Sequence, residues 1–459
     1  MTELSRYGKV LRRYKCYGNL ELPTKESFKC SFEAVQFIDG AVREQCYFPD
    51  LSNSESNALV SHLRDGVAIE SISGVTEDGQ EVKLGRQILW TNINYRTTAD
   101  TRAIIVTLIA AEMLVKPKGV DHRLSTLRFG ITNFEFEGNI VREQKTEAGQ
   151  QFDRAILSAN LPFGEMRIER LPGYEEAIAN LKALQDIEPT CEISLELPRN
   201  HDIRWTEKVV DVLCRILSLA KGTKIGWIYL DGYDTEGLKR FTLHRHAVTM
   251  PYAGESASVV GSLHPEDMKE LIEKGNERFS QLDAEYDLGR VIDSYLEAKR
   301  PHSYLESKGL AAIQAMELLA GKYAKTHNLV YVIDQNEFNQ KLNEIGNDVR
   351  KVLQVAFGEG HVTTICGERN EKLEGLNRRT LRQVLREIFH NFSISVSGPR
   401  LNALIDTRNA LVHKGSFNTN DRVREYRQII STMDRVLLKM LGYEGYILDC
   451  EHNWGRVKL

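Results

Sequence analysis

The stretch His264-Pro265-Glu266-Asp267 marks the point where the pattern of this sequence changes. After it, apolar residues recur with the period of a helix, and few Gly or Pro residues interrupt them. We expect helices at about residues 266–280, 285–299, 303–326, 335–356, 376–393, 399–414 and 420–441. Tandem helices joined by short loops predict an up-and-down bundle.

Before this stretch the sequence is mostly typical of strands. Residues 28–38 end in the turn signal Asp39-Gly40, and the pattern resumes at residues 46–48. Similar runs occur at residues 67–72, 86–95 and 127–136, and this spacing of short strands suggests a sandwich or a partly open barrel. Between about 165 and 275 the pattern is mixed, with helices expected at 175–184 and 206–219 and strands at 192–197 and 225–230.

We therefore predict an α+β protein in three parts. Residues 1–165 form a β-rich region, residues 166–275 form an α+β portion of the N-terminal half, and residues 276–459 form an all-α bundle. The middle portion either packs on the β-rich region or forms its own domain. A chain of 459 residues is too long for one ordinary core, which favours two or three domains.

Composition narrows the class of protein. The chain is 42% hydrophobic and 27% charged, as in soluble globular proteins. Its first residues include no apolar signal segment, and Thr107 and Glu112 interrupt the longest apolar run, so we expect no membrane span. The seven cysteines are scattered, with no C-x-x-C pair, which argues against zinc and against a disulfide framework. These features predict a cytoplasmic protein without a metal or other cofactor.

Positive charge gathers in one part of the chain. The net charge is −4 overall, yet residues 369–439 hold 14 Lys and Arg against 7 Asp and Glu, a net of +7. Such an excess is expected around a polyanion site. A solvated helix face gives the same count, and charge alone does not separate the two interpretations.

The segment Asp406-Thr407-Arg408-Asn409-Ala410-Leu411-Val412-His413-Lys414-Gly415 lies inside this basic region. Arg408 falls in the apolar stripe of the predicted helix, so its guanidinium needs an anion, a carboxylate or a wet cleft. Asn409 and His413 are four residues apart and share one side of the helix. Arg408 and His413 differ by about 140° in azimuth, and they converge if the helix frays at Lys414 or if two protomers each contribute one set.

Two interpretations of this segment are open on these grounds. In one, Arg408 pairs with Asp406 or Glu387, and His413 only complements the dipole at the end of its helix. In the other, Arg408 and His413 act on a phosphate. Arginine binds phosphate oxygens through its planar fork, and histidine transfers protons near neutral pH.

The sequence Arg-Asn-Ala-Leu-Val-His resembles the R-x4-6-H signature of HEPN domains, in which a polar residue such as Asn commonly follows the arginine. The resemblance covers roughly residues 285–445 and is closest to the Apea-like HEPN group, whose members carry a β-rich region ahead of the bundle. It implies a metal-independent endoribonuclease that assembles a composite site in a homodimer. It also implies a role in prokaryotic antiviral (abortive-infection) defence, with the N-terminal half sensing a trigger, such as one derived from a phage, or regulating the enzyme.

On this hypothesis Arg408 binds phosphate and the transition state, and His413 is the general acid or base. Asn409 orients the histidine or contacts the phosphate. Glu317, on an apolar helix, and Asp406 are candidate supporting carboxylates. The candidate RNA-binding residues are Arg378, Arg379, Arg382 and Arg386, expected on one basic helix ending at His390, together with Lys414.

Other candidates are weaker. His244 and His246 alternate as on a strand, but no third metal ligand is evident, and Asp231-Gly232 and Asp234 suggest a turn. The sequence contains no phosphate-binding loop, nucleophile elbow or dinucleotide fingerprint, so ATPase, hydrolase-fold and dehydrogenase functions have no support. The competing class is a non-catalytic HEPN-like adaptor that dimerises or binds a nucleotide or RNA without cleaving it.

Overall fold

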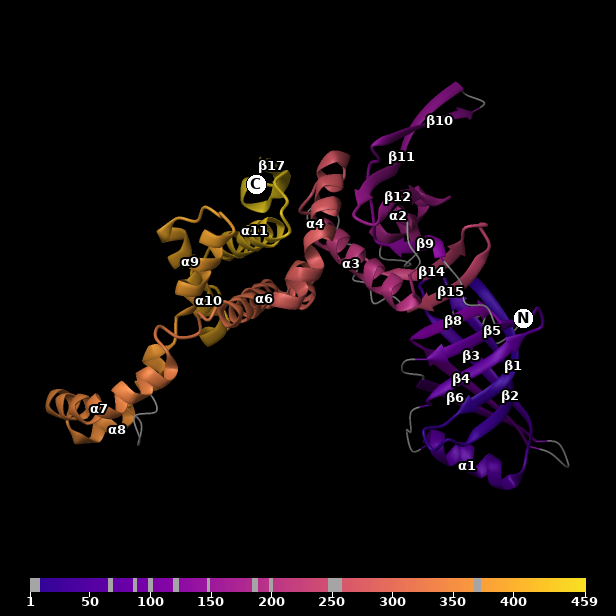
Figure 1. The fold of residues 1–459 in the computed structure, drawn as a ribbon, viewed down its shortest axis with the longest axis horizontal. Coiled ribbons are helices and arrows are strands. Elements are labelled where there is room, and N and C mark those ends of the chain that lie inside the picture. Colours follow the sequence, from indigo (N-terminus) through magenta and orange to yellow (C-terminus); the bar gives the residue numbers. More distant parts are fainter. Residues whose placement is uncertain are drawn as a thin grey trace. The chain divides into compact units, whose positions relative to one another are not determined.

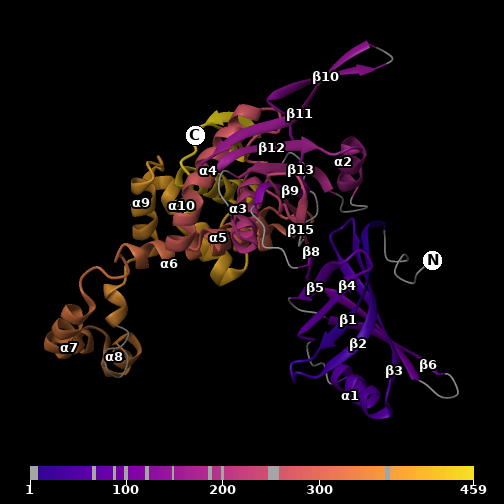
Figure 2. The same ribbon diagram turned by 45° about the vertical axis from the view of Figure 1, so that its right-hand side comes forward.

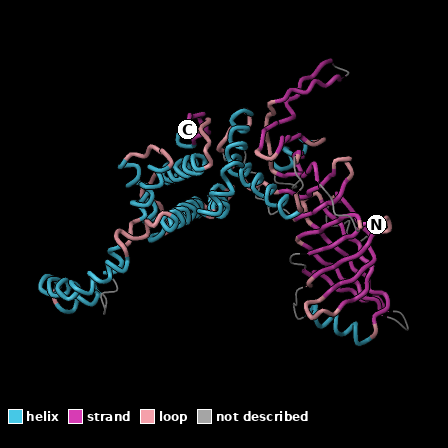
Figure 3. The backbone as a smooth tube through the Cα atoms, viewed as in Figure 1, coloured by secondary structure: helices cyan, strands magenta, loops and turns pink. Residues whose placement is uncertain are grey.

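The computed structural model describes residues 9–64, 69–85, 89–97, 102–118, 124–146, 149–183, 189–197, 201–246, 258–366 and 373–459. The chain divides into two compact units, Met1–Glu277 and Arg278–Leu459. Strands dominate the first unit and helices the second (Figure 3). The predicted class, a β-rich half followed by a helical bundle, is confirmed.

The strands of the first unit form one antiparallel sheet of 15 strands within the described residues, in the order β10-β11-β12-β13-β9-β14-β15-β8-β5-β4-β1-β2-β3-β7-β6. Their bounds are β1 Val10–Glu21, β2 Ser27–Phe37, β3 Val42–Leu51, β4 Ser71–Thr76, β5 Gln80–Gly85, β6 Leu89–Thr97, β7 Arg102–Ala110, β8 Glu112–Pro117, β9 Leu124–Thr132, β10 Ile140–Thr146, β11 Gly149–Leu161, β12 Gly164–Arg170, β13 Pro189–Glu196, β14 Trp227–Asp234 and β15 Lys239–Arg245.

Part of this sheet curls back on itself. The strands β7 and β8 are separated by a single residue, yet they lie at opposite ends of the run β8-β5-β4-β1-β2-β3-β7. The run must therefore bend until its two ends approach each other, as a barrel does. Helix α1, Asn53–Arg64, lies where the strands of this run end, at the bottom of Figures 1 and 2.

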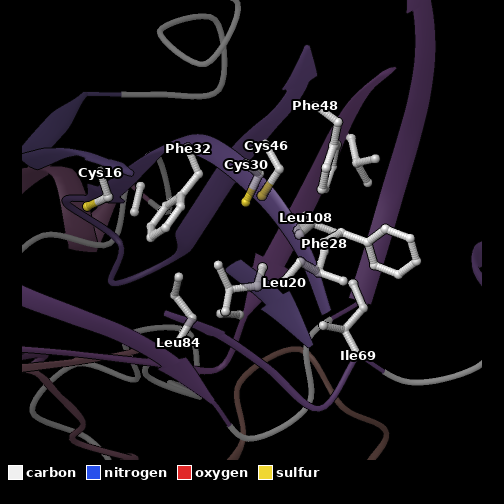
Figure 4. Packing of buried hydrophobic residues seen from close by; sticks show 14 of the residues in the cluster. Cys16, Leu20, Phe28, Cys30, Phe32, Cys46, Phe48, Ile69, Leu84 and Leu108 are labelled. Carbon is white, nitrogen blue, oxygen red and sulfur yellow. The ribbon is translucent and has the colours of Figure 1, made fainter. Parts of the chain in front are cut away.

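The curvature creates the main core of the first unit. Buried apolar side chains from β1 to β5, β7 and β8 form one cluster, which includes Leu59 and Leu63 of α1. Figure 4 shows part of it, with Phe28, Phe32 and Phe48 packed near aliphatic and cysteine side chains. Burial of apolar surface at about 25 cal/mol per Å² is the main term that stabilises such a curl.

The remaining strands of the first unit carry two helices, α2 at Tyr174–Lys182 and α3 at Ile203–Lys221. Asp202 caps α3 by accepting the N–H of Trp205, and Gly222, with a φ of 62°, ends it. The expected boundary at residue 165 falls inside β12, which pairs with both β11 and β13. The sheet therefore continues across that position.

Several predicted strands need new bounds. The hairpin through Asp39-Gly40 is confirmed as β2 and β3. The strand expected at 67–72 begins only at Ser71, and residues 67–68 and 86–88 of the expected strands lie outside the described residues. The strand expected at 127–136 ends at Thr132, because Asn133 adopts a left-handed φ of 60°.

The second unit begins at Arg278, inside helix α4, Pro265–Tyr286, which spans the boundary between the units. Its further helices are α5 Leu288–Lys299, α6 Leu305–Thr326, α7 Gln335–Phe357, α8 Glu359–Cys366, α9 Leu381–Asn391, α10 Gly398–Lys414 and α11 Arg422–Met440. Helix α6 contacts α5, α9, α10 and α11, so it is the central element of the bundle. A buried ionic group, Lys299 with Asp434 and Tyr295, ties α5 to α11.

Three features of the second unit were not predicted. Helices α7 and α8 share a small core of their own with the 3-10 helix η3, Leu373–Asn377. The helix expected at 376–393 is shortened at its start to α9, Leu381–Asn391. After α11 the chain forms a hairpin of β16, Tyr446–Asp449, and β17, Gly455–Lys458, joined through the 3-10 helix η4, Cys450–His452.

Candidate functional site

Helix α10 carries the central residues of the predicted site. It begins after Ser397, whose side chain accepts the N–H of Arg400, with Pro399 in the first turn. It ends at Gly415, whose φ of 68° is the left-handed conformation that favours glycine, and whose N–H donates to the carbonyl of Leu411. The helix is therefore intact through Lys414, because the glycine caps its last turn, and of the two ways for Arg408 and His413 to converge only the one with two protomers is left.

The sides of α10 have different environments. One side is buried, through Leu401, Leu404, Thr407, Ala410 and Leu411. The opposite side is an exposed polar stripe of Asn402, Asp406, Asn409 and His413, which follow one another at helical spacing. Val412 is also exposed, although its side chain is apolar. Asn409 and His413 are thus both accessible to a ligand and lie one helical turn apart.

Arg408 lies at the edge between the buried and the exposed sides. Its side chain is 26% exposed and reaches helix α6, where Nε and Nη2 bind Oε1 of Glu317 at 2.6 and 2.5 Å. Its Nη1 donates to Oδ1 of Asn409 at 3.0 Å. Glu317 therefore holds one edge of the guanidinium, while the other edge is turned toward the stripe that contains His413.

This geometry decides which carboxylate holds the arginine. Asp406 is exposed on the polar stripe, about 160° around the helix from Arg408, and no ion pair joins the two within the described part of the chain. Glu317 is only half-buried, with 37% of its side chain exposed. The Arg408–Glu317 pair therefore sits in partial contact with water, where an exchange of partners is inexpensive.

The loop after α10 is fixed by a residue that the sequence analysis missed. The buried Glu425 of α11 accepts the Thr407 hydroxyl at 3.0 Å and the N–H groups of Asn418 and Thr419 at 2.9 and 2.6 Å. Phe417 of the same loop packs so closely on Gly309 of α6 that a Cβ there would lie 2.8 Å from its ring. The sequence feature that could have identified Glu425 was a glutamate in the first turns of a helix that follows a short polar loop.

The four arginines predicted as one basic helix are divided by the structure. Arg378 and Arg379 precede α9, and they contact the segment at 330–332 through the bridge from Arg378 to Tyr331 and a hydrogen bond from Arg379 Nε to the Tyr331 carbonyl. Arg382 and Arg386 lie on α9 with His390, one turn apart and all exposed. Lys414 is exposed in the last turn of α10. The predicted helix of four arginines is therefore wrong, because a long-range strand-like bridge holds the first two.

Polar candidates of the first unit lie in strands. His244 is buried in β15, where its Nε2 is 3.1 Å from the Tyr14 hydroxyl, while His246 is exposed just beyond that strand. The turn predicted at Asp231-Gly232 is wrong, because both residues belong to β14. Gly232 is needed there because a Cβ would lie 2.2 Å from the ring of Phe241.

Asp231 is the centre of a buried polar cluster. It accepts hydrogen bonds from Arg12, Lys239 and Thr242 at 2.6 to 3.0 Å. Burial alone would raise the pKa of Asp231, but the hydrogen bond and the charge of Arg12 outweigh it, and the pKa is lowered. All of these donors to Asp231 are side chains of the same unit. We therefore interpret the cluster as structural.

Comparison with known proteins adds no relative, because no family model, no curated protein and no solved structure matches this chain. Among the helices within the described ranges, none combines the length and the apolar character needed to cross a bilayer. Nor do three His, Cys, Asp or Glu side chains of the described residues converge where they would hold a metal ion. All seven cysteines are buried as free thiols.

Proposed function

We propose that this protein is a metal-independent endoribonuclease whose site is built on Arg408, Asn409 and His413. The observation that carries the proposal is the partly exposed guanidinium of Arg408, held on one side by Glu317 and directed by Asn409 toward the polar stripe that contains His413. RNA contains its own nucleophile in the 2′-OH, so the protein has to move protons and stabilise charge. An arginine fork and an exposed imidazole are suited to these two tasks.

The proposed reaction proceeds in one displacement. The 2′ oxygen attacks the adjacent phosphorus and loses its proton to an imidazole, while the bond from phosphorus to the 5′ oxygen breaks. The leaving 5′ oxygen takes a proton from a second acid, and Arg408 binds the phosphoryl oxygens as their negative charge increases. The products are a 2′,3′-cyclic phosphate and a 5′-hydroxyl end.

One histidine cannot easily serve both sides of the phosphorus. We therefore propose a homodimer through the helical unit, in which His413 of a partner subunit supplies the second proton-transfer group. The two-protomer arrangement also removes the difficulty that Arg408 and His413 differ by about 140° in azimuth on an intact helix.

The proposed cellular role rests on the resemblance to the Apea-like HEPN group and on the toxicity of an uncontrolled ribonuclease. An enzyme that cuts cytoplasmic RNA is toxic unless restrained. We propose that the protein is a restrained effector of antiviral defence, and that the large N-terminal unit senses a trigger, such as a phage-derived one, or regulates cleavage.

The test is cleavage of a defined RNA in EDTA, followed by analysis of the new ends. Arg408→Ala and His413→Ala should each lower the rate about 10²-fold or more while the circular dichroism spectrum is unchanged. Asn402→Ala is the matched control, because Asn402 is exposed on the same stripe but lies about two turns from Asn409 and about three from His413. Full activity in either site variant contradicts the proposal. RNA that is bound but uncut by the wild type favours the competing adaptor function.

A further inference from the structure

A polar groove lies on the helical unit, away from the polar stripe of α10. It has a volume of about 500 Å³, and its lining includes Arg400, Asp421, Arg424, Arg427, Gln428 and Glu451. These residues come from the first turns of α10 and α11 and from η4. A volume of this size is typical of sites for small ligands.

The groove is separate from the proposed catalytic site. Arg400, its contribution from α10, is thirteen residues from His413, which is about 20 Å along the helix axis and about 140° around it. A ligand of the groove therefore approaches a different side of α10 from a substrate at Asn409 and His413.

The cations of the groove are held in different ways. Arg400 is paired with Glu451 and is also close to the Thr432 hydroxyl. Arg427 is oriented by Asn453, which accepts from its Nη1 at 3.3 Å, and by the ring of Trp454, 4.7 Å from the guanidinium carbon. Within the described residues, neither Arg424 nor Arg427 has a carboxylate at ion-pair distance.

Hydrogen bonds to one buried carboxylate hold the wall that carries Glu451 and His452. The side chain of Asp449, fully buried behind it, accepts hydrogen bonds from the Glu451 N–H, from Arg435 and from His452. The groove is thus formed before a ligand arrives, which lowers the entropic cost of binding.

The mixture of charges selects the class of ligand. Arg424 and Arg427 lie one turn apart on α11 and present two guanidinium forks, which suit the several oxygens of a phosphate. The carboxylates of Asp421 and Glu451 in the same groove would repel a ligand that is only anionic. They favour a ligand that also carries hydrogen-bond donors, as the hydroxyls of a ribose and the amino groups of a base do.

We propose that this groove binds a nucleotide, with its phosphate on Arg424 and Arg427 and its sugar or base toward Gln428 and Glu451. The nucleotide is either a free molecule or one residue of an RNA strand, since both present the same groups. The groove is a binding site separate from the cleavage chemistry, and its existence does not depend on that chemistry.

The test measures binding to the full-length protein. The probes are AMP, inorganic pyrophosphate and a fluorescein-labelled 2′-O-methyl dodecaribonucleotide, which lacks the nucleophile needed for cleavage. The combined Arg424→Ala and Arg427→Ala change should weaken binding of AMP or of the oligonucleotide about tenfold or more. Arg422→Ala is the matched control, because Arg422 is the neighbouring arginine of α11 but pairs with Glu306 outside the groove, and it should alter binding less than about twofold.

The pattern of losses identifies the source of the ligand. Loss of AMP binding supports a free nucleotide, and loss confined to the oligonucleotide supports an RNA strand. Unchanged binding of both probes in the double variant overturns the proposal, as does pyrophosphate binding as tightly as AMP. If the double variant does not fold, Arg424→Glu alone makes the same test, since Arg424 is exposed. Cleavage of unmodified RNA by each variant shows separately whether the proposed nuclease activity stands.

Discussion

Two arginine–carboxylate pairs, one in each unit, show how differently the same two side-chain types are used. In the sheet, Arg12 binds both oxygens of Asp231 at 3.0 Å, and the carboxylate side chain is only 4% exposed. In the helical unit, Arg408 binds one oxygen of Glu317, whose side chain is 37% exposed. Lys239 and Thr242 complete the first pair, whereas Asn409 directs the second toward exposed groups.

The difference separates a structural pair from a candidate functional one. A buried carboxylate whose partners are all supplied by the fold has no capacity left for a ligand, and removing a partner strands its charge. A partly exposed pair contributes little to stability, so its arginine can turn to a phosphate at small cost. The contrast predicts that the same substitution will lower stability at Arg12 and lower activity at Arg408.

The largest expected effect is on the stability of the sheet. Arg12→Met should destabilise the first unit by roughly 2–3 kcal/mol, because Asp231 remains buried with its charge only partly compensated. Arg408→Met should change the stability of the helical unit by less than about 1 kcal/mol while abolishing RNA cleavage. Hydrogen exchange followed by mass spectrometry reads each unit separately, through peptides of β14 and β15 and of α10. Equal destabilisation by the two changes would show that Arg408 is a structural residue.

A smaller effect on stability is expected from two buried groups of the sheet, His244 and Glu44, whose pKa values are shifted in opposite directions. Burial, and then the charge of Arg12, lower the pKa of His244 to about 3, although Asp231 partly opposes this and Lys239 adds to it. The unfolded chain therefore takes up a proton below about 6.5 that the fold rejects, and stability falls by about 1.4 kcal/mol per pH unit as the pH decreases from 6.5 toward 3. Burial raises the pKa of Glu44 well above its ordinary 4.5 despite the nearby Arg43, so its contribution to stability is lost as the pH rises above 4.5.

Between pH 4.5 and 6.5 these two contributions oppose each other, and variants should separate them. In His244→Gln the stability of the first unit should fall as the pH rises, because the Glu44 term is left alone. In Glu44→Gln it should rise with pH, because the His244 term is left alone. Calorimetric unfolding across this range makes the measurement, with the wild type as the reference. Parallel pH profiles for the two variants would contradict the assignment.

The local elements could be predicted from the sequence, but their long-range partners could not. The period of apolar residues was sufficient to predict helices α6, α10 and α11. A glutamate on the otherwise apolar helix α6 also made Glu317 a candidate partner of Arg408, and the structure pairs the two. Nothing local indicates that β7 and β8, adjacent in the chain, lie at opposite ends of a curled run. That order depends on pairings between distant strands.

The errors have the same physical origin. Asp231-Gly232 has the composition of a turn, but the ring of Phe241 from the neighbouring strand requires the glycine inside β14. Arg378 was predicted to lie in a helix, but its bridge to Tyr331 holds it outside α9. In each case a tertiary contact overrode the local preference.

The smallest effect we predict sharpens the role of Glu317 in this comparison. If the carboxylate only positions Arg408, then Glu317→Ala should lower cleavage about tenfold, mainly through kcat, because a misplaced guanidinium weakens stabilisation of the transition state. Glu317→Gln keeps an acceptor oxygen for Arg408 Nε and should recover part of the rate. Glu306→Ala is the matched control, since Glu306 lies on the same helix and pairs with the exposed Arg422. A loss in Glu317→Gln as large as in Glu317→Ala would show that the negative charge itself is needed, and Glu317 would then be more than an anchor for the arginine.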